Sequence, residues 1–146
     1  MAHSTYKLTI PSSTRYLEDV RHFVETHAIE ADLSETAVEQ LKMAVDEACT
    51  NVIEHAYNGE GEHQIDIAVI VKPDRLVVRI RDEGETFDLD SYEEPNIFEF
   101  AKRHKKGGFG VHIMRRLMDH VEYRTRGNVN ECCMIKYRNN SKALDR

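Results

Sequence analysis

The sequence predicts an α+β fold: a two-layer sandwich in which a mixed, mostly antiparallel sheet carries its helices on one face. Two observations predict it. Most strand-like segments come in adjacent pairs joined by short turns, as in antiparallel hairpins. The helix-like segments lie outside these pairs, and their apolar residues repeat at helical spacing. The chain of 146 residues is long enough for one core, so we expect residues 1–146 to form a single domain.

Each element has its own signal in the sequence. Alternating apolar residues mark the strands, and turn residues such as Pro73-Asp74 and Gly127-Asn128 separate paired strands. Ser34 is suited to cap the longest helix, and the glycine-containing residues 58–61 stop it. The expected elements, in chain order, are a strand over 6–10, helices over 12–28 and 34–57, strands over 65–71 and 75–81, a helix over 111–120, and strands over 121–126 and 132–137. The polar tail at 139–146 is expected to fray.

Composition excludes several classes of protein. With 26 acidic and 20 basic residues, the formal net charge is −6, which argues against direct binding of nucleic acid. No run of 18 apolar residues is present, so we expect no membrane-spanning helix, and the N-terminus lacks an apolar signal segment. Three cysteines are an odd number, and the neighbours Cys132 and Cys133 are poorly placed to pair with each other. We therefore expect a reducing, cytoplasmic environment.

The second half of the long helix carries an unusual polar pair. Leu41, Val45 and Ala48 form part of an apolar stripe, and Glu47 and Asn51 lie on the face beside it. Their spacing of four residues stacks the carboxylate and the amide one helical turn apart. An amide oxygen can ligate Mg²⁺, and a nearby carboxylate can act as a base. The alternative is an ordinary solvated helix face.

Two glycine-containing corners can complete a nucleotide site. Asp82 ends a predicted strand and Gly84 follows, so the acid can accept a hydrogen bond from an exocyclic amine while the glycine leaves room for a flat ring. Gly108 and Gly110 open a predicted helix, where free N–H groups and the helix dipole favour phosphate. The alternatives are an ordinary turn and a flexible helix entry. Residues 85–107 show no periodic pattern, which is typical of a long functional or disordered loop.

Taken together, these motifs resemble those of the GHKL ATP-binding superfamily, which includes gyrase and the histidine kinases. The matched sequences are Glu47-Ala48-Cys49-Thr50-Asn51 with His55-Ala56-Tyr57 behind it, then Arg81-Asp82-Glu83-Gly84, and then Gly108-Phe109-Gly110-Val111-His112-Ile113-Met114. The chain is most similar to the small stand-alone anti-sigma factor serine-protein kinases of bacteria. The resemblance extends from the first strand to about Tyr137 and implies a Bergerat-type ATP-binding fold.

The resemblance assigns a role to each matched residue. It implies that the protein binds ATP and Mg²⁺, with residues 85–107 forming a lid over the nucleotide. The implied roles are Mg²⁺ ligand for Asn51, general base for Glu47, adenine recognition for Asp82 with Gly84, and phosphate binding for Gly108 and Gly110. Lys106 stands two residues before Gly108, where it either reaches the terminal phosphate or is a solvated lysine.

The activity implied by the resemblance is that of an Mg-ATP-dependent serine/threonine-protein kinase acting as an anti-sigma factor. Such a protein binds a sigma factor, holds it inactive, and phosphorylates a Ser or Thr on a small STAS-type anti-anti-sigma antagonist. Two alternatives stay open: a non-kinase binding module in which nucleotide gates a partner switch, and a regulator of a pathway other than a sigma factor. No sequence feature decides between a monomer and the homodimer that is common in this group.

Two departures from the family pattern concern the adenine site. Members often carry Gly-Thr in the last strand, where the hydroxyl helps to hold the adenine-reading acid. Glu131-Cys132-Cys133 stands in that place here, and a thiol is a weak hydrogen-bond donor, which predicts a weaker hold on the acid. The wider superfamily also has a second glycine after Asp-x-Gly, and Glu85-Thr86-Phe87 replaces it here.

Overall fold

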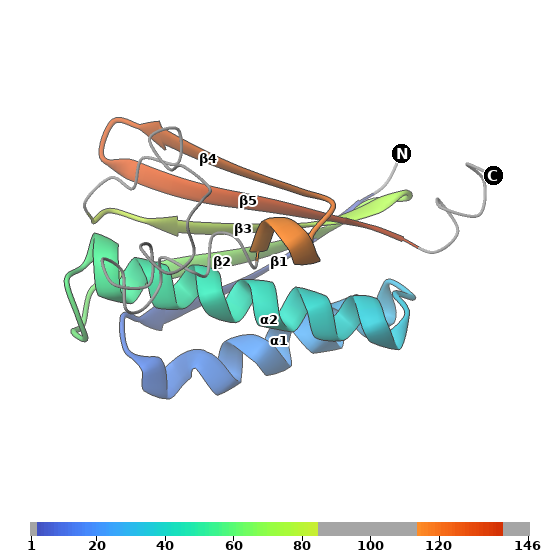
Figure 1. The fold of residues 1–146 in the computed structure, drawn as a ribbon, viewed down its shortest axis with the longest axis horizontal. Coiled ribbons are helices and arrows are strands. Elements are labelled where there is room, and N and C mark those ends of the chain that lie inside the picture. The colour runs from blue at the N-terminus through green and yellow to red at the C-terminus, as the bar shows by residue number, and fades with distance from the viewer. Residues whose placement is uncertain (1–2, 85–113, 139–146) are drawn as a thin grey trace.

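The computed structural model describes residues 3–84 and 114–138. In these ranges it has five strands and two long α-helices, arranged as two layers (Figure 1). The elements are β1 (Ser4–Pro11), a 3₁₀ turn η1 (Thr14–Tyr16), α1 (Leu17–Glu30), α2 (Glu35–Asn51), a π-helical turn η2 (Val52–Ala56), β2 (Gln64–Val71), β3 (Arg75–Asp82), β4 (His120–Arg126) and β5 (Val129–Tyr137). Residues 114–117 are also helical.

The strands form one open sheet in the order β1-β2-β3-β5-β4, and every strand pair in the described ranges is antiparallel. The helices α1 and α2 pack against each other on one face of this sheet (Figure 1). The predicted α+β, two-layer architecture is therefore confirmed, as are the hairpins β2–β3 and β4–β5. Because β3 pairs with β5, its last residue, Asp82, lies opposite Asn130.

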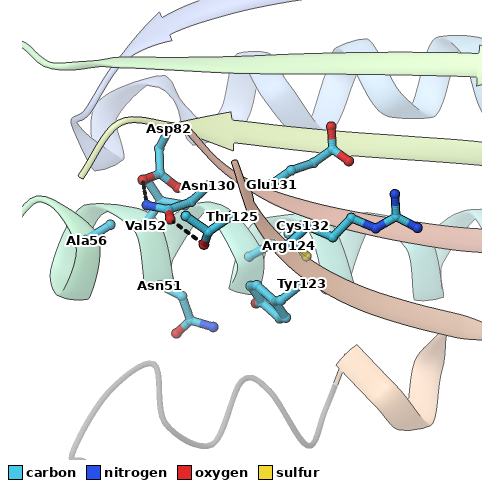
Figure 2. Close-up of a pocket in the computed structure, with 11 residues that line it drawn as sticks. Asn51, Val52, Ala56, Asp82, Tyr123, Arg124, Thr125, Asn130, Glu131 and Cys132 are labelled. Atoms are coloured by element: carbon cyan, nitrogen blue, oxygen red, sulfur yellow. Dashed lines mark hydrogen bonds between the residues drawn. The ribbon is translucent and has the colours of Figure 1, made fainter. Parts of the chain in front are cut away.

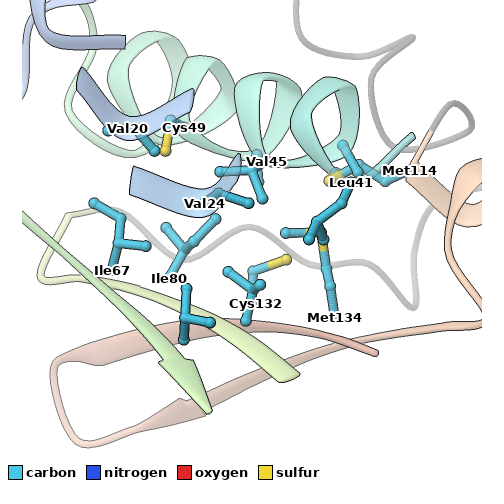
Figure 3. Close-up of a cluster of buried hydrophobic side chains, with 14 of the residues drawn as sticks. Val20, Val24, Leu41, Val45, Cys49, Ile67, Ile80, Met114, Cys132 and Met134 are labelled. Carbon is cyan, nitrogen blue, oxygen red and sulfur yellow. The ribbon is translucent and has the colours of Figure 1, made fainter. Parts of the chain in front are cut away.

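The hydrophobic core lies between the sheet and the two helices. Alternate residues of β2, β3 and β5 point toward the helices and are buried, among them Ile67, Ile80 and Met134 (Figure 3). Val24 of α1 and Val45 of α2 belong to the same buried cluster. Burying one aliphatic side chain of this size stabilises the folded state by about 1.5–3 kcal/mol relative to exposure. This packing holds α2 against β3 and β5, the elements that carry the candidate site.

The two ends of the long helix combine an expected and an unexpected feature. The Ser34 hydroxyl accepts a hydrogen bond from Ala37 N at 3.1 Å, so it caps α2 as predicted. At the other end, the α-helix changes into the π-helical turn Val52–Ala56, which was not predicted. Asn58 and Gly59 then take positive φ angles of 57° and 116°, which ends the helical segment where expected.

Two helix boundaries differ from the prediction. Ser13 caps a 3₁₀ turn, and α1 begins only after that turn. The helix predicted over 111–120 extends too far at its C-terminal end, because His120 is already the first residue of β4. The N–H of Asp119 donates to the carbonyl oxygen of Ile135 at 3.0 Å. The chain is therefore joined to β5 before the predicted helix would have ended.

Several predicted features lie outside the described residues. They are the lid at 85–107 with Lys106, the phosphate corner formed by Gly108 and Gly110, and the tail at 139–146. The other predicted site residues, on α2 and at the end of β3, are described. No helix in the described part of the chain combines the length and the apolar character needed to cross a membrane.

Candidate active site

A cavity lies between α2, the end of β3 and the β4–β5 hairpin (Figure 2). One side is formed by the C-terminal end of α2 and the π-helical turn, and the other side by the three strands. The residues that line it are Ala48, Asn51, Val52, Ala56, Asp82, Tyr123, Arg124, Thr125, Asn130, Glu131 and Cys132. Two of the predicted site residues, Asn51 and Asp82, therefore meet at one cavity although they belong to different layers of the fold.

Asp82 is the last residue of β3 and is 6% exposed. Its Oδ1 accepts hydrogen bonds from the backbone N–H of Gly84 and from Asn130 Nδ2, both at 2.9 Å. Burial raises the pKa of the Asp82 carboxyl, and these two donors oppose the rise. Because both donors bind the same oxygen, the carboxylate is held in one orientation, and Oδ2 accepts no hydrogen bond from the other described residues.

Gly84 lies so close to the π-helical turn that a side chain does not fit. A Cβ atom at this position would lie 2.4 Å from the carbonyl oxygen of Ala56 and 2.8 Å from the Ala56 Cβ. Any side chain would push the two segments apart. It would also move the Gly84 N–H, which binds Asp82, and the Gly84 carbonyl, which accepts from Asn130 Nδ2 at 2.9 Å. The glycine is therefore required by the protein's own packing.

Asn51 is the last residue of α2, and its side chain lines the same cavity (Figure 2). It is 6% exposed, yet neither Oδ1 nor Nδ2 has a hydrogen-bond partner among the described residues. Burial raises the pKa of the Tyr123 hydroxyl, and the nearby Asn51 side chain opposes that rise. The two side chains nevertheless lack the geometry of a hydrogen bond. A buried amide without partners costs about 1–3 kcal/mol, so this amide is suited to an entering ligand.

Glu47 lies one helical turn before Asn51 on α2 and is half-buried. Burial raises the pKa of its carboxyl, and the negative charges of Asp46 and Glu54 raise it further. A raised pKa makes the ionised carboxylate a better proton acceptor. Glu47 is not among the described residues that line the cavity, although Asn51, one turn further along α2, is.

Asn130 is a site residue that sequence reasoning missed. It is 8% exposed, and its Nδ2 donates to both Asp82 Oδ1 and the Gly84 carbonyl. The signal that identifies it is the strand register, which puts Asn130 directly opposite Asp82 in the β3–β5 pair. A single sequence does not reveal that register, because the two residues are 48 positions apart.

Tyr57 is a second residue whose role was not predicted, although it ends one of the matched motifs. Its hydroxyl accepts a hydrogen bond from Glu83 N and donates one to the carbonyl oxygen of Gln64, each at 2.8 Å. Its ring stacks on the His63 ring, with the centroids 4.5 Å apart. Tyr57 therefore ties the segment after α2 to the start of β2 and to the residue that follows Asp82.

Cys132 stands where the resembled family often has a threonine hydroxyl. In this chain a neighbouring position supplies the hydrogen bond to Asp82. Cys132 is 3% exposed, and burial raises the pKa of its thiol to about 12, so the thiol is a neutral group of the core. In the β3–β5 register it lies opposite Ile80. Asn130, two residues earlier, lies opposite Asp82 and supplies the hydrogen bond. The side-chain hydrogen bond to Asp82 therefore comes from the Asn130 amide and not from position 132.

Comparison with known proteins identifies the family. The histidine kinase-like ATPase domain family matches residues 10–136 of this chain. The serine-protein kinase RsbW of Bacillus velezensis is 32% identical over 141 residues, which cover 93% of this chain and 87% of the relative. The serine-protein kinase RsbW of Listeria monocytogenes serotype 4a is 33% identical over 124 residues, which cover 82% and 79%. The chain belongs to the histidine kinase-like ATPase family.

Solved structures agree on the fold. The structure of the RsbU and RsbW domains of Rv1364c from Mycobacterium tuberculosis superposes with a TM-score of 0.64 at 12% identity, over 91% of this chain. A histidine kinase domain from Erythrobacter litoralis gives a TM-score of 0.56 at 15% identity, over 92% of this chain. The chain spans only 32% and 64% of these two structures. The resemblance to GHKL serine-protein kinases is confirmed, and the chain is an ATP-using serine kinase of this family.

Proposed function

We propose that this protein is an Mg-ATP-dependent serine/threonine-protein kinase that acts as an anti-sigma factor in the cytoplasm. It binds a sigma factor and holds it inactive, and it phosphorylates a Ser or Thr on a small STAS-type anti-anti-sigma protein. The phosphate on that antagonist decides which partner is held. The RsbW relatives support the kinase part. The net charge of −6 fits a protein that acts on other proteins and does not bind nucleic acid directly.

The adenine of ATP is read by Asp82 in this proposal. An ionised carboxylate accepts a hydrogen bond from the exocyclic amino group of adenine, and Oδ2 is the oxygen that other described residues leave open. Gly84 sets the distance between the end of β3 and the π-helical turn, and so the width of the pocket for the ring. Asp82 and Asn51 line the same cavity, which supports the binding of both to one ligand.

Mg²⁺ is held by the Oδ1 of Asn51. The fit rests on the buried amide without partners, because an amide oxygen is a suitable ligand for a hard cation that otherwise keeps water and phosphate oxygens around it. When bound, the ion neutralises charge on the phosphates. The packing of α2 against the sheet holds the backbone that carries Asn51.

Glu47 is the general base. Its carboxylate takes the proton of the attacking Ser or Thr hydroxyl as that oxygen bonds to the terminal phosphorus and the bond from phosphorus to the ADP oxygen breaks. The raised pKa of Glu47 supports the role. Because Glu47 is only half-buried, it is accessible to a hydroxyl presented by a partner protein.

The remaining roles rest on the sequence pattern. Gly108 and Gly110 bind the phosphates, Lys106 reaches the terminal phosphate, and residues 85–107 close over the nucleotide. The observation that carries the proposal is the meeting of Asn51 and Asp82 at one cavity, with Glu47 one turn away.

The decisive experiment mixes the purified protein with a STAS-domain protein from the same organism, Mg²⁺ and ATP labelled in the terminal phosphate. We expect label on a Ser or Thr of the STAS protein. Glu47→Gln should bind ATP as the parent protein does but lose label transfer by at least about 100-fold, the usual contribution of a general base. Glu39→Gln is the matched control, because Glu39 lies on the same helix but is exposed and pairs with Lys42.

Each result has a clear reading. Full transfer by Glu47→Gln would remove the base assignment. Binding of ATP by the parent protein without any transfer would favour a nucleotide-gated binding module. Transfer to a STAS protein without capture of a sigma factor from the native cell would favour a regulator of another pathway.

A further inference from the structure

The hydrogen bonds around the adenine-reading acid form a short chain that crosses three strands. Thr125 of β4 donates from Oγ1 to Asn130 Oδ1 at 2.9 Å (Figure 2). Asn130 of β5 then donates from Nδ2 to Asp82 Oδ1 (Figure 2). The same Nδ2 also donates to the Gly84 carbonyl. We infer that Asn130 is the positioning residue that makes this site selective for a purine carrying an amino group. This inference rests on the proposed function of Asp82.

The orientation of the Asn130 amide follows from its partners. On one side it faces a carboxylate oxygen and a backbone carbonyl oxygen, both of which can only accept hydrogen bonds when Asp82 is ionised. Only the NH₂ group of the amide can satisfy both. The amide oxygen must then point the other way, where the Thr125 hydroxyl donates to it. The contacts on both sides of the amide require the same placement of its oxygen and nitrogen, so one orientation is strongly favoured.

As a result, the Asp82 carboxylate is held ionised and can only accept hydrogen bonds. Its Oδ1 already receives two donors, the Gly84 N–H and the Asn130 amide. Both donors stabilise the ionised carboxylate against the burial that disfavours it. Oδ2 therefore meets the base as a pure acceptor. An amino group on the base is bound, and a carbonyl oxygen in its place is repelled, which separates adenine from a 6-oxo purine.

In this chain the side chain that donates to Asp82 comes from Asn130 and not from Cys132. Cys132, in the place of the hydroxyl common in the resembled group, is a neutral core thiol that lies opposite Ile80. Asn130 is 8% exposed and lies directly opposite Asp82, so it alone among the described strand residues donates a side-chain hydrogen bond to that acid. The selectivity of the site is thus assigned to Asn130, a position that the family's sequence motifs do not include.

The test measures the affinity of the full chain for ATP and for inosine triphosphate, which carries a carbonyl oxygen in place of the amino group. The parent protein should prefer ATP strongly. In Asn130→Ala, we expect the affinity for ATP to fall by about tenfold or more, the value of one hydrogen bond to a charged group. The affinity for inosine triphosphate should fall less or rise, because an acid without Asn130 can turn or take a proton and donate to the carbonyl oxygen.

A pH profile separates this role from general damage to the fold. Asp82 must be ionised to accept from the amino group, and loss of Asn130 removes a contact that lowers its pKa. ATP affinity should therefore decline with falling pH, and the decline should begin at a higher pH in Asn130→Ala than in the parent protein. A variant that is merely less stable would lose affinity for both nucleotides by the same factor at each pH, so its preference for ATP would match that of the parent protein.

Two further variants keep the test decisive. Thr125→Val removes the donor to the Asn130 oxygen at an exposed residue and should lower the preference for ATP partially. It serves in place of Asn130→Ala if that variant does not fold. Asn128→Ala is the control, because the side chain of this exposed residue donates a hydrogen bond to Glu83, at 3.3 Å, and none to Asp82 or Asn130. This change should leave the preference for ATP as it is.

The outcomes distinguish the inference from the function on which it rests. If Asp82→Asn keeps both the affinity and the preference for ATP, the proposed adenine-reading role is wrong. If Asp82→Asn abolishes the preference while Asn130→Ala and Thr125→Val leave it and the pH profile unchanged, only the role of Asn130 is overturned.

Discussion

Gly84→Ala is the sharpest single perturbation of the site, because it adds one carbon atom at a place where there is no room. The new Cβ would lie 2.4 Å from the Ala56 carbonyl oxygen, 2.6 Å from its carbonyl carbon and 2.8 Å from its Cβ. Two of these three atoms belong to the backbone of a helical turn, so no side chain can rotate away. The segment after β3 or the turn itself must move.

The size of the effect follows from the kind of contact. Overpacking of this type destabilises a protein by about 1–3 kcal/mol. The backbone of Gly84 takes no left-handed φ angle, so the loss is steric and does not come from backbone strain. The movement also shifts the Gly84 N–H away from Asp82 Oδ1 and the Gly84 carbonyl away from Asn130. ATP affinity should therefore fall together with stability.

Urea unfolding followed by circular dichroism measures the stability, and titration calorimetry measures ATP binding. Gly61→Ala is the matched control. A Cβ there would meet its nearest atoms, on His63 and Ser12, at 3.6 Å, which is ordinary contact. We expect its stability to change by no more than about 0.5–1 kcal/mol. If Gly84→Ala were as stable as Gly61→Ala and bound ATP as tightly as the parent protein, the close packing of the β3 end on the π-helical turn would be refuted.

Two further predictions concern the polar residues of α2. Asn51→Leu removes a buried amide that has no described partner, so the nucleotide-free protein should gain about 1 kcal/mol of stability while ATP affinity loses its dependence on Mg²⁺; lower stability in urea would contradict this account. Glu47 must be ionised to act as a base, and its pKa is raised in the folded protein. As the pH falls, phosphotransfer should therefore begin to decline at a pH above the ordinary glutamate pKa of about 4.3. The pH profile of Glu47→Gln should lack that decline.

The fold was predictable because its signals are local. Alternation along each strand, the turn at Pro73-Asp74 and the cap at Ser34 each depend on a few neighbouring residues, and the structure confirms the hairpins and the cap. The boundary at His120 was wrong for the opposite reason. It is set by a hydrogen bond from Asp119 to Ile135 on another strand, and helical spacing alone does not contain that information.

The site divides in the same way. Glu47, Asn51 and Asp82 could be proposed as site residues because their positions on one helix and at one strand end can be read along the chain. Asn130 could not be found, because its role depends on the β3–β5 register across 48 positions. The π-helical turn after Asn51 was also missed. A single wider turn needs no distinct composition, yet it carries the Ala56 backbone against Gly84.

The two ends of the cavity are prepared for a nucleotide to different degrees. At the end that we propose for adenine, Asp82 is already held by two donors, so binding a base would require little reorganisation of the protein. At the other end, the Asn51 amide is buried and has no hydrogen-bond partner among the described residues. The hydrogen bonds that orient Asp82 are therefore present before any base binds. The desolvation penalty of the unpaired Asn51 amide, in contrast, is relieved only when a ligand binds. Adenosine alone should accordingly bind with a measurable affinity that does not change with Mg²⁺, and the ion should strengthen binding only when phosphates are present.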